Sequence, residues 1–136
     1  MSDFHQFGPV TALPRLRDVS VDGLEHAILH WTSRSPVSLV LPMVPEEMGR
    51  PALERILDEL CVVPYLDSLV VALNRATSDD FERARAFFDR YPGRRLILWC
   101  EAPGIRAFMD DMVAAGLTLG GEGKGRACWL ALGYLL

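Results

Sequence analysis

Glycines and cationic side chains gather in one stretch of the sequence, Gly120-Gly121-Glu122-Gly123-Lys124-Gly125-Arg126. Glycine lets a backbone approach a ligand closely and adopt positive φ angles. A helix that follows such a loop points free N–H groups at the loop, which favours an anion. Lys124 and Arg126 add charge that suits a phosphate or a carboxylate. The spacing matches neither a Walker A loop nor the dinucleotide-binding fingerprint, and a Gly-rich turn with solvated basic residues is the alternative interpretation.

Three strand-loop-helix units precede this loop and would position it. Residues 37–41, 69–73 and 96–99 are short apolar runs of the kind found in strands that are buried on both faces. Pro42 is expected to end the first strand, and Ser78 to cap the helix after the second. The pattern predicts an α/β fold of the three-layer αβα type, with a Rossmann-like parallel sheet at its core and right-handed crossovers.

Ligands of such sheets bind beyond the carboxyl ends of the strands. That rule collects residues 42–47, 74–77 and 100–101 along one edge, where the loop at 120–126 can join them. The polar groups available to a ligand are then those of Glu46, Glu47, Asn74, Arg75, Glu101, Lys124 and Arg126. For Arg75 and Arg126 a plain surface charge is the favoured interpretation.

Residues 1–20 are expected to form an irregular N-terminal arm, and residues 21–136 one α/β half-domain. Asp22 is expected to cap a helix that follows the arm. His26 and His30 lie four residues apart on this helix and are expected to be a surface pair, not a metal site. The apolar residues expected to face inward on the first, second and fourth helices are Leu24, Ala27, Ile28 and Trp31; Leu53, Ile56, Leu57 and Leu60; and Ile105, Phe108, Met109 and Met112.

Composition excludes several classes of protein. The formal charge of −4 argues against a nucleic-acid binder, and no apolar run is long enough to cross a membrane. The N-terminus lacks the pattern of a signal peptide, so the sequence predicts a cytoplasmic protein. Cys61, Cys100 and Cys128 show no paired spacing and lie in apolar stretches. Buried thiols are therefore expected, and a cysteine-dependent enzyme has little support.

The order of these motifs resembles the glycosyltransferases of the GT-A fold. Leu41-Pro42 followed by Glu46-Glu47 is similar to the opening of that fold, Ser78-Asp79-Asp80 to its second element, and Gly123-Lys124-Gly125 to its Gly-Lys-Gly loop. A narrower bacterial group, related to glucosyl-3-phosphoglycerate and mannosylglycerate synthases, is similar over nearly the whole chain. The segments that carry this closer resemblance are residues 73–76, 98–103 and 123–129, with Gly133-Tyr134.

The resemblance implies a nucleotide-diphosphate sugar donor, a UDP- or GDP-hexose, a divalent metal ion such as Mg²⁺ or Mn²⁺, and transfer of a hexosyl group to a small hydroxylated acceptor. It implies that Pro42 and Glu46 shape the pocket for the base and ribose, and that Asn74 meets the nucleoside. Lys124, between Gly123 and Gly125, would approach the base or the diphosphate, as a lysine ammonium suits phosphate.

The sequence departs from the family in one respect that concerns the metal. The family holds its metal with an Asp-x-Asp motif, and no two aspartates have that spacing here. We expect the metal-binding strand and the acceptor half to lie beyond this sequence, and no catalytic residue is identified. The alternative is a non-catalytic nucleotide-binding or protein-interaction α/β module. The apolar helix at residues 127–136 would then pack on a partner or on a second copy in a homo-oligomer.

Overall fold

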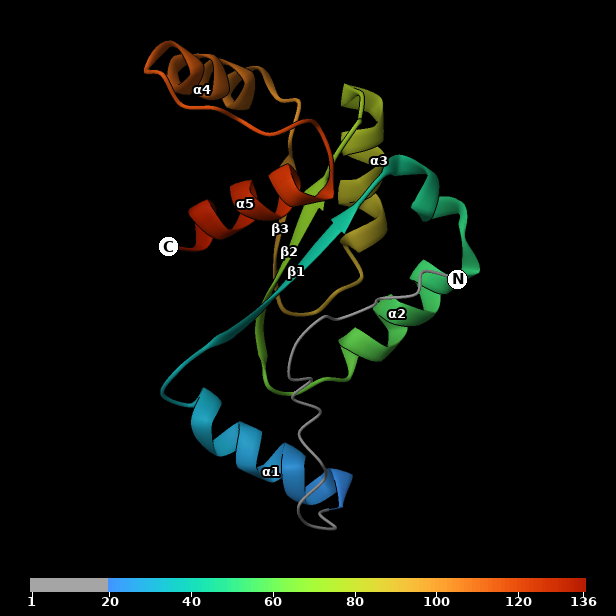
Figure 1. Cartoon of the computed structure of the whole chain (residues 1–136). Helices are drawn as coiled ribbons and strands as arrows, with labels where there is room; N and C mark the ends of the chain where they lie inside the picture. Colours follow the sequence, from blue (N-terminus) through green and yellow to red (C-terminus); the bar gives the residue numbers. More distant parts are fainter. Residues whose placement is uncertain (1–19) are drawn as a thin grey trace, which may run out of the picture.

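The computed structural model describes residues 20–136, which form a parallel three-stranded sheet with helices on both faces (Figure 1). The strand order is β1-β2-β3, and all pairs are parallel. This confirms the predicted three-layer α/β architecture. The elements in chain order are α1 (Val21–Thr32), β1 (Val37–Met43), the 3₁₀ helix η1 (Pro45–Gly49), α2 (Pro51–Cys61), β2 (Leu66–Leu73), α3 (Ser78–Phe88), β3 (Arg94–Trp99), α4 (Pro103–Ala114) and α5 (Lys124–Leu135).

Central strand β2 separates two apolar cores. On one face, Leu69, Val71 and Leu73 pack with α2 and α3, whose Leu57 and Phe88 are fully buried. On the other face, the strand packs against α4 and α5. That second core contains Val70, Ala72, Cys100, Met109, Ala127, Leu130 and Ala131. An unbroken apolar strand therefore fits this place, because both of its faces are covered.

Pro42 lies within β1, so the prediction that it ends this strand was wrong. The Met43 carbonyl accepts a hydrogen bond from the Asn74 N–H on the β2 side, at 3.0 Å. Because backbone groups alternate in direction along a strand, the nitrogen of Pro42 faces the opposite side of β1. That side has no strand neighbour among residues 20–136, so the missing N–H of proline costs no hydrogen bond between strands.

Some apolar residues predicted to face inward do not. Ile56 of α2 is 44% exposed and Phe108 of α4 is 49% exposed. α1 has no buried residue, and its Trp31 is 70% exposed. Figure 1 shows the reason, since α1 stands below the sheet and is not laid on either face. Helical spacing identifies an apolar face, but only the tertiary fold decides whether another element covers it.

The helix ends follow ordinary capping chemistry, with two corrections to the predicted residues. Ser20, and not Asp22, caps α1, because its hydroxyl accepts from the Gly23 N–H at 3.1 Å. Thr77, and not Ser78, caps α3. After the C-terminal end of α4, Gly116 has φ +86°, a left-handed conformation that glycine adopts at low cost after a helix.

Within residues 20–136, no helix has the length and apolar character needed to cross a membrane.

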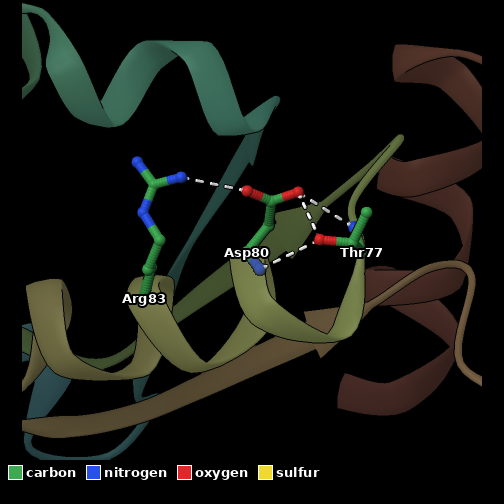
Figure 2. Close-up of polar contacts among 3 residues, drawn as sticks. All are labelled: Thr77, Asp80 and Arg83. Atoms are coloured by element: carbon green, nitrogen blue, oxygen red, sulfur yellow. Dashed lines mark hydrogen bonds and ion pairs between the residues drawn. The ribbon is translucent and has the colours of Figure 1, made fainter.

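Thr77 and Asp80 form a reciprocal capping box at the start of α3 (Figure 2). The Asp80 N–H donates to the Thr77 hydroxyl at 3.2 Å, and the Thr77 N–H donates to the Asp80 carboxylate at 3.0 Å. Arg83 donates to the other carboxylate oxygen at 3.1 Å. The hydrogen bonds from the Thr77 backbone and hydroxyl, aided by the nearby Arg83 charge, hold the pKa of Asp80 below its ordinary value of 3.8.

Asp80→Asn is expected to lower stability in a pH-dependent way. A pKa that is depressed in the folded state adds stability above the unfolded pKa, and this stability is lost as the pH falls through the folded pKa. The free-energy gap between wild type and variant should therefore be full at pH 7 and shrink below about pH 4. Urea unfolding across this range measures it. The adjacent exposed Asp79→Asn is the control, and a gap for Asp80→Asn that stays constant down to pH 3 would contradict the assignment.

Phe88→Ala is expected to lower the free energy of unfolding by about 3–5 kcal/mol, because it leaves a cavity in a core where the ring is fully buried. Phe108→Ala removes the same side chain from a half-exposed position and should cost less than about 1 kcal/mol. Urea unfolding compares the two. If Phe88→Ala does not fold, Phe88→Leu gives a milder loss on the same scale. Equal losses at positions 88 and 108 would contradict the described core.

Candidate functional site

The carboxyl edge of the sheet holds a cavity of about 210 Å³ that contains three of the predicted site residues. Pro42 comes from the end of β1, Asn74 directly follows β2, and Lys124 begins α5. These residues are far apart in sequence and meet because parallel strands end at the same edge. The full lining consists of Pro42, Met43, Val44, Glu47, Asn74, Lys124 and Ala127.

Asn74 is the buried polar centre of this edge, with only 7% of its surface exposed. Asn74 also lines a second, more polar cavity of about 330 Å³, together with Glu101, Arg106 and Arg126. Within residues 20–136 the carboxamide makes no hydrogen bond, although it carries both donors and acceptors. The amide is therefore available to a ligand in either cavity.

The loop after β2 is held from β3 by two side chains. Glu101 accepts from the Arg75 N–H at 2.7 Å and from the Ala76 N–H at 3.1 Å. Trp99 donates its indole N–H to the Ala76 carbonyl at 2.9 Å. Arg75 itself has φ +57°, a left-handed conformation that is unfavourable for a residue with a side chain. Glu101 was predicted as a group available to a ligand, and in the structure its two oxygens bind backbone amides.

Lys124 is the only lysine of the sequence and lies exposed at the first position of α5. Among residues 20–136 it forms no ion pair, and the nearby Glu47 pairs instead with Arg50 at 3.2 Å. The N-cap residue, Gly123, provides no side-chain cap for the helix. The first turn of α5 therefore presents uncapped N–H groups beside a lysine ammonium, and both features favour an anion.

The glycines of the 120–126 loop do not have the backbone role expected of them. None of them lies in the left-handed region, since Gly123 has an extended φ of 161° and Gly116 alone among the glycines of residues 20–136 is left-handed. A Cβ atom added at Gly120, Gly121, Gly123 or Gly125 would meet no atom within 4 Å. The fold thus requires no glycine at these positions, and their effect is to leave the backbone of the loop open to approach.

Arg126 was expected to be a surface charge, and this was wrong. Its guanidinium is largely covered and donates to the Gly120 carbonyl, which closes the loop on itself. A weaker contact to the Glu122 carboxylate spans 3.9 Å. The buried Nε has no hydrogen-bond partner among the described residues. Arg126 therefore holds the loop in shape, whereas Arg75 is exposed, as expected for a surface charge.

Glu46 does not share the cavity with Pro42, Asn74 and Lys124. It is exposed and lines a separate depression with Arg75, Asp80 and Arg83. Glu47 lines the cavity in its place. Both glutamates lie in η1, where adjacent side chains point about 120° apart. The sequence places an acid in this loop, but it contains no signal that selects one of two neighbours.

The described residues do not fit a metal ion. Among residues 20–136, no group of three or more His, Cys, Asp or Glu side chains gathers in a way that could hold one. A divalent metal therefore enters no step assigned to these residues.

Cys100 lines the second cavity, and burial, aided by the Glu101 charge, raises the pKa of its thiol to about 11. Such a thiol is a poor nucleophile at neutral pH.

The fold and the cavity at its carboxyl edge define this chain as a Rossmann-like α/β half-domain. Curated proteins similar to it are glucosyl-3-phosphoglycerate synthases. The one from Persephonella marina is 31% identical over 136 residues, which is the whole chain and 34% of that protein. The one from Methanococcoides burtonii is 30% identical over 99 residues, which is 72% of the chain and 24% of that protein.

These similarities confirm the glycosyltransferase relationship that the motifs implied, and it extends over the full chain. The chain spans about a third or less of the length of these relatives. No protein-family profile matches the chain. No solved structure matches it significantly.

Cys100 is expected to be alkylated more slowly than Cys61 and Cys128 in the folded chain at pH 8. It is the buried one of the three, and its raised pKa leaves little thiolate. Peptide mass spectrometry after timed exposure to iodoacetamide measures each rate. The difference should vanish in urea, which serves as the control. Fast alkylation of Cys100 in the folded protein would contradict its described environment.

Proposed function

We propose that residues 21–136 form the donor-binding part of a glycosyltransferase. The whole enzyme would move a hexosyl group from a nucleotide-diphosphate sugar, a UDP- or GDP-hexose, to a small hydroxylated acceptor. The observation that carries the proposal is the meeting of Pro42, Asn74 and Lys124 in one cavity at the carboxyl edge of the sheet. It is supported by the similarity to glucosyl-3-phosphoglycerate synthases.

The anionic part of the donor would bind at the start of α5. The Lys124 ammonium forms no ion pair within the described residues 20–136, and the uncapped first turn of the helix adds backbone N–H donors. Gly123 and Gly125 leave room for a phosphate or base to approach the backbone. A lysine here acts as a point charge that suits a diphosphate.

The nucleoside would bind between the ends of β1 and β2. Pro42 provides an apolar wall, and the Asn74 amide offers a donor and an acceptor to a base or a ribose. The acidic role that the resemblance implies for Glu46 would pass to Glu47, which lines the cavity. The two cavities that share Asn74 together fall in the range of roughly 300–1,000 Å³ usual for small-molecule sites.

Metal-assisted transfer is an expectation for the whole enzyme only. Among residues 20–136 no three or more His, Cys, Asp or Glu side chains gather as metal ligands, so the binding that we propose relies on Lys124, Asn74 and backbone N–H groups and uses no metal ligand of this chain. No residue of this chain is assigned to the chemical step.

A second candidate, a protein-interaction module, is favoured by one observation. Trp129 and Leu132 are exposed on the outward face of α5, and Tyr134 is exposed near its C-terminal end, whereas Ala127, Leu130 and Ala131 are buried on the sheet. Exposed apolar surface of this kind is typical of a contact with a partner or with a second copy of the chain.

A thermal-shift screen separates the two candidates. A ligand that binds only the folded state raises the melting temperature. The ligands are UDP, GDP and their glucose and mannose conjugates, each with and without Mn²⁺. A shift that is selective for one nucleotide and independent of Mn²⁺ is the expected result. The absence of a shift from every nucleotide, in a chain that melts cooperatively, would favour the interaction module.

Lys124→Ala is expected to weaken binding of the nucleotide found in that screen by about 10- to 100-fold. A hydrogen bond to a charged group contributes about 1.5–3 kcal/mol, and a tenfold change in affinity corresponds to about 1.4 kcal/mol. Titration calorimetry measures the loss. Arg55→Ala removes one positive charge from an exposed site on α2 and is the matched control. Equal effects of the two substitutions would reject the role of Lys124.

Because Lys124 is the only lysine, its chemical modification gives an independent measure. Apart from the chain's α-amino group, an acylating reagent has one amine to modify. Bound nucleotide should slow acylation of Lys124, read by peptide mass spectrometry, and leave the α-amino group unaffected.

A further inference from the structure

We propose that Glu101 is a positioning residue for the nucleotide pocket, an inference that rests on the proposed function. Its carboxylate holds the loop after β2 in a left-handed turn and thereby keeps Asn74 in the cavity. Glu101 would act through the backbone of Arg75 and Ala76, without contacting the ligand.

The two hydrogen bonds from the Arg75 and Ala76 N–H groups to the Glu101 carboxylate are called the clamp, and their geometry suits a positioning role. A carboxylate only accepts hydrogen bonds, and here its two oxygens receive two consecutive backbone N–H groups, at 2.7 and 3.1 Å. Hydrogen bonds with an ionised acceptor are about twice as strong as neutral ones. Glu101 is the second residue after β3. The residue before it, Cys100, donates its N–H to the Leu73 carbonyl of β2 at 2.9 Å. The clamp is therefore anchored on the sheet itself.

The loop needs such a clamp because Arg75 is strained. Its φ of +57° lies in the left-handed region, which disfavours residues that have a Cβ atom. Strained backbone persists only where surrounding contacts hold it. Asn74 is still part of the ladder, since its N–H donates to Met43, and Thr77 already caps α3. The chain must therefore turn within two residues, and it does so at Arg75.

Trp99 secures the other side of the same loop. Its indole N–H donates to the Ala76 carbonyl, and its ring stacks on Phe81 of α3 with centroids 5.6 Å apart. Ala76 is thus held through both its N–H and its carbonyl, from two residues of one segment. Without the Glu101 contacts the left-handed turn would relax, and the adjacent Asn74 side chain would lose its fixed place between the two cavities.

The competing explanation is direct contact of Glu101 with the ligand, since it also lines the larger of those cavities. A glycine at position 75 separates the two explanations. Glycine adopts positive φ without the Cβ penalty, so the turn would no longer depend on the clamp. A positioning role would be relieved by Arg75→Gly, whereas a direct contact would not.

The experiment is a double-mutant cycle of E101Q and R75G, read by titration calorimetry with the nucleotide identified in the thermal screen. Gln places an N–H₂ group against one backbone N–H and so breaks half of the clamp. E101Q alone is expected to weaken binding by about tenfold. In the R75G background the same substitution should cost less than about twofold. Glu59→Gln, on the exposed face of α2, is the matched control and should leave affinity unchanged.

Amide hydrogen exchange by NMR gives a readout that needs no nucleotide. The Arg75 and Ala76 amides should exchange more rapidly in E101Q than in wild type, while those of the β2 strand should not change. Equal exchange in both proteins would overturn the clamp. A tenfold loss of affinity from E101Q in both backgrounds would overturn the positioning role and leave the proposed function standing.

Nucleotide binding by wild type and by E101Q distinguishes a wrong donor site from a wrong role of Glu101. If the wild-type chain binds no nucleotide, the donor-site proposal fails and the positioning role fails with it. In that case amide exchange still decides whether Glu101 clamps the loop. If wild type binds and E101Q binds equally well, only the positioning role is rejected.

Discussion

Burial of β2 on both faces is the constraint from which the other features of this fold follow. Its residues Leu69 to Leu73 are almost completely removed from water, so helices must cover the sheet from both sides. Parallel neighbours on both edges complete its backbone hydrogen bonds. The same strand then delivers Asn74, still inside the ladder, to the carboxyl edge where the cavities lie.

That edge combines two kinds of interaction from distant parts of the chain. The ends of β1 and β2 supply a proline wall and a buried amide, while α5 supplies a lysine and an uncapped helix N-terminus. α5 reaches this place because its Ala127, Leu130 and Ala131 pack on the sheet. Core packing and the candidate site therefore depend on the same helix.

Much of this could be predicted from the sequence because apolar runs and turn residues report directly on strands and helices. The parallel α/β fold and the convergence of residues 42, 74 and 124 are examples. Local ambiguities were not resolvable. Thr77 and Ser78 are both good N-cap residues, and Glu46 and Glu47 are adjacent acids. Which member of each pair caps the helix or lines the cavity depends on a shift of one residue, which the sequence pattern does not determine.

The sequence by itself determined the order of elements and the chemical character of each loop, because those depend on short-range patterns of apolar, polar and turn-forming residues. Only the tertiary structure decided that α1 stands away from the sheet, that Arg126 closes its own loop, and that Glu101 holds the backbone of the neighbouring loop. These contacts join groups by their positions in space. A hydrogen bond between residues 75 and 101 depends on the distance between two loop ends, which the packing of the strands sets.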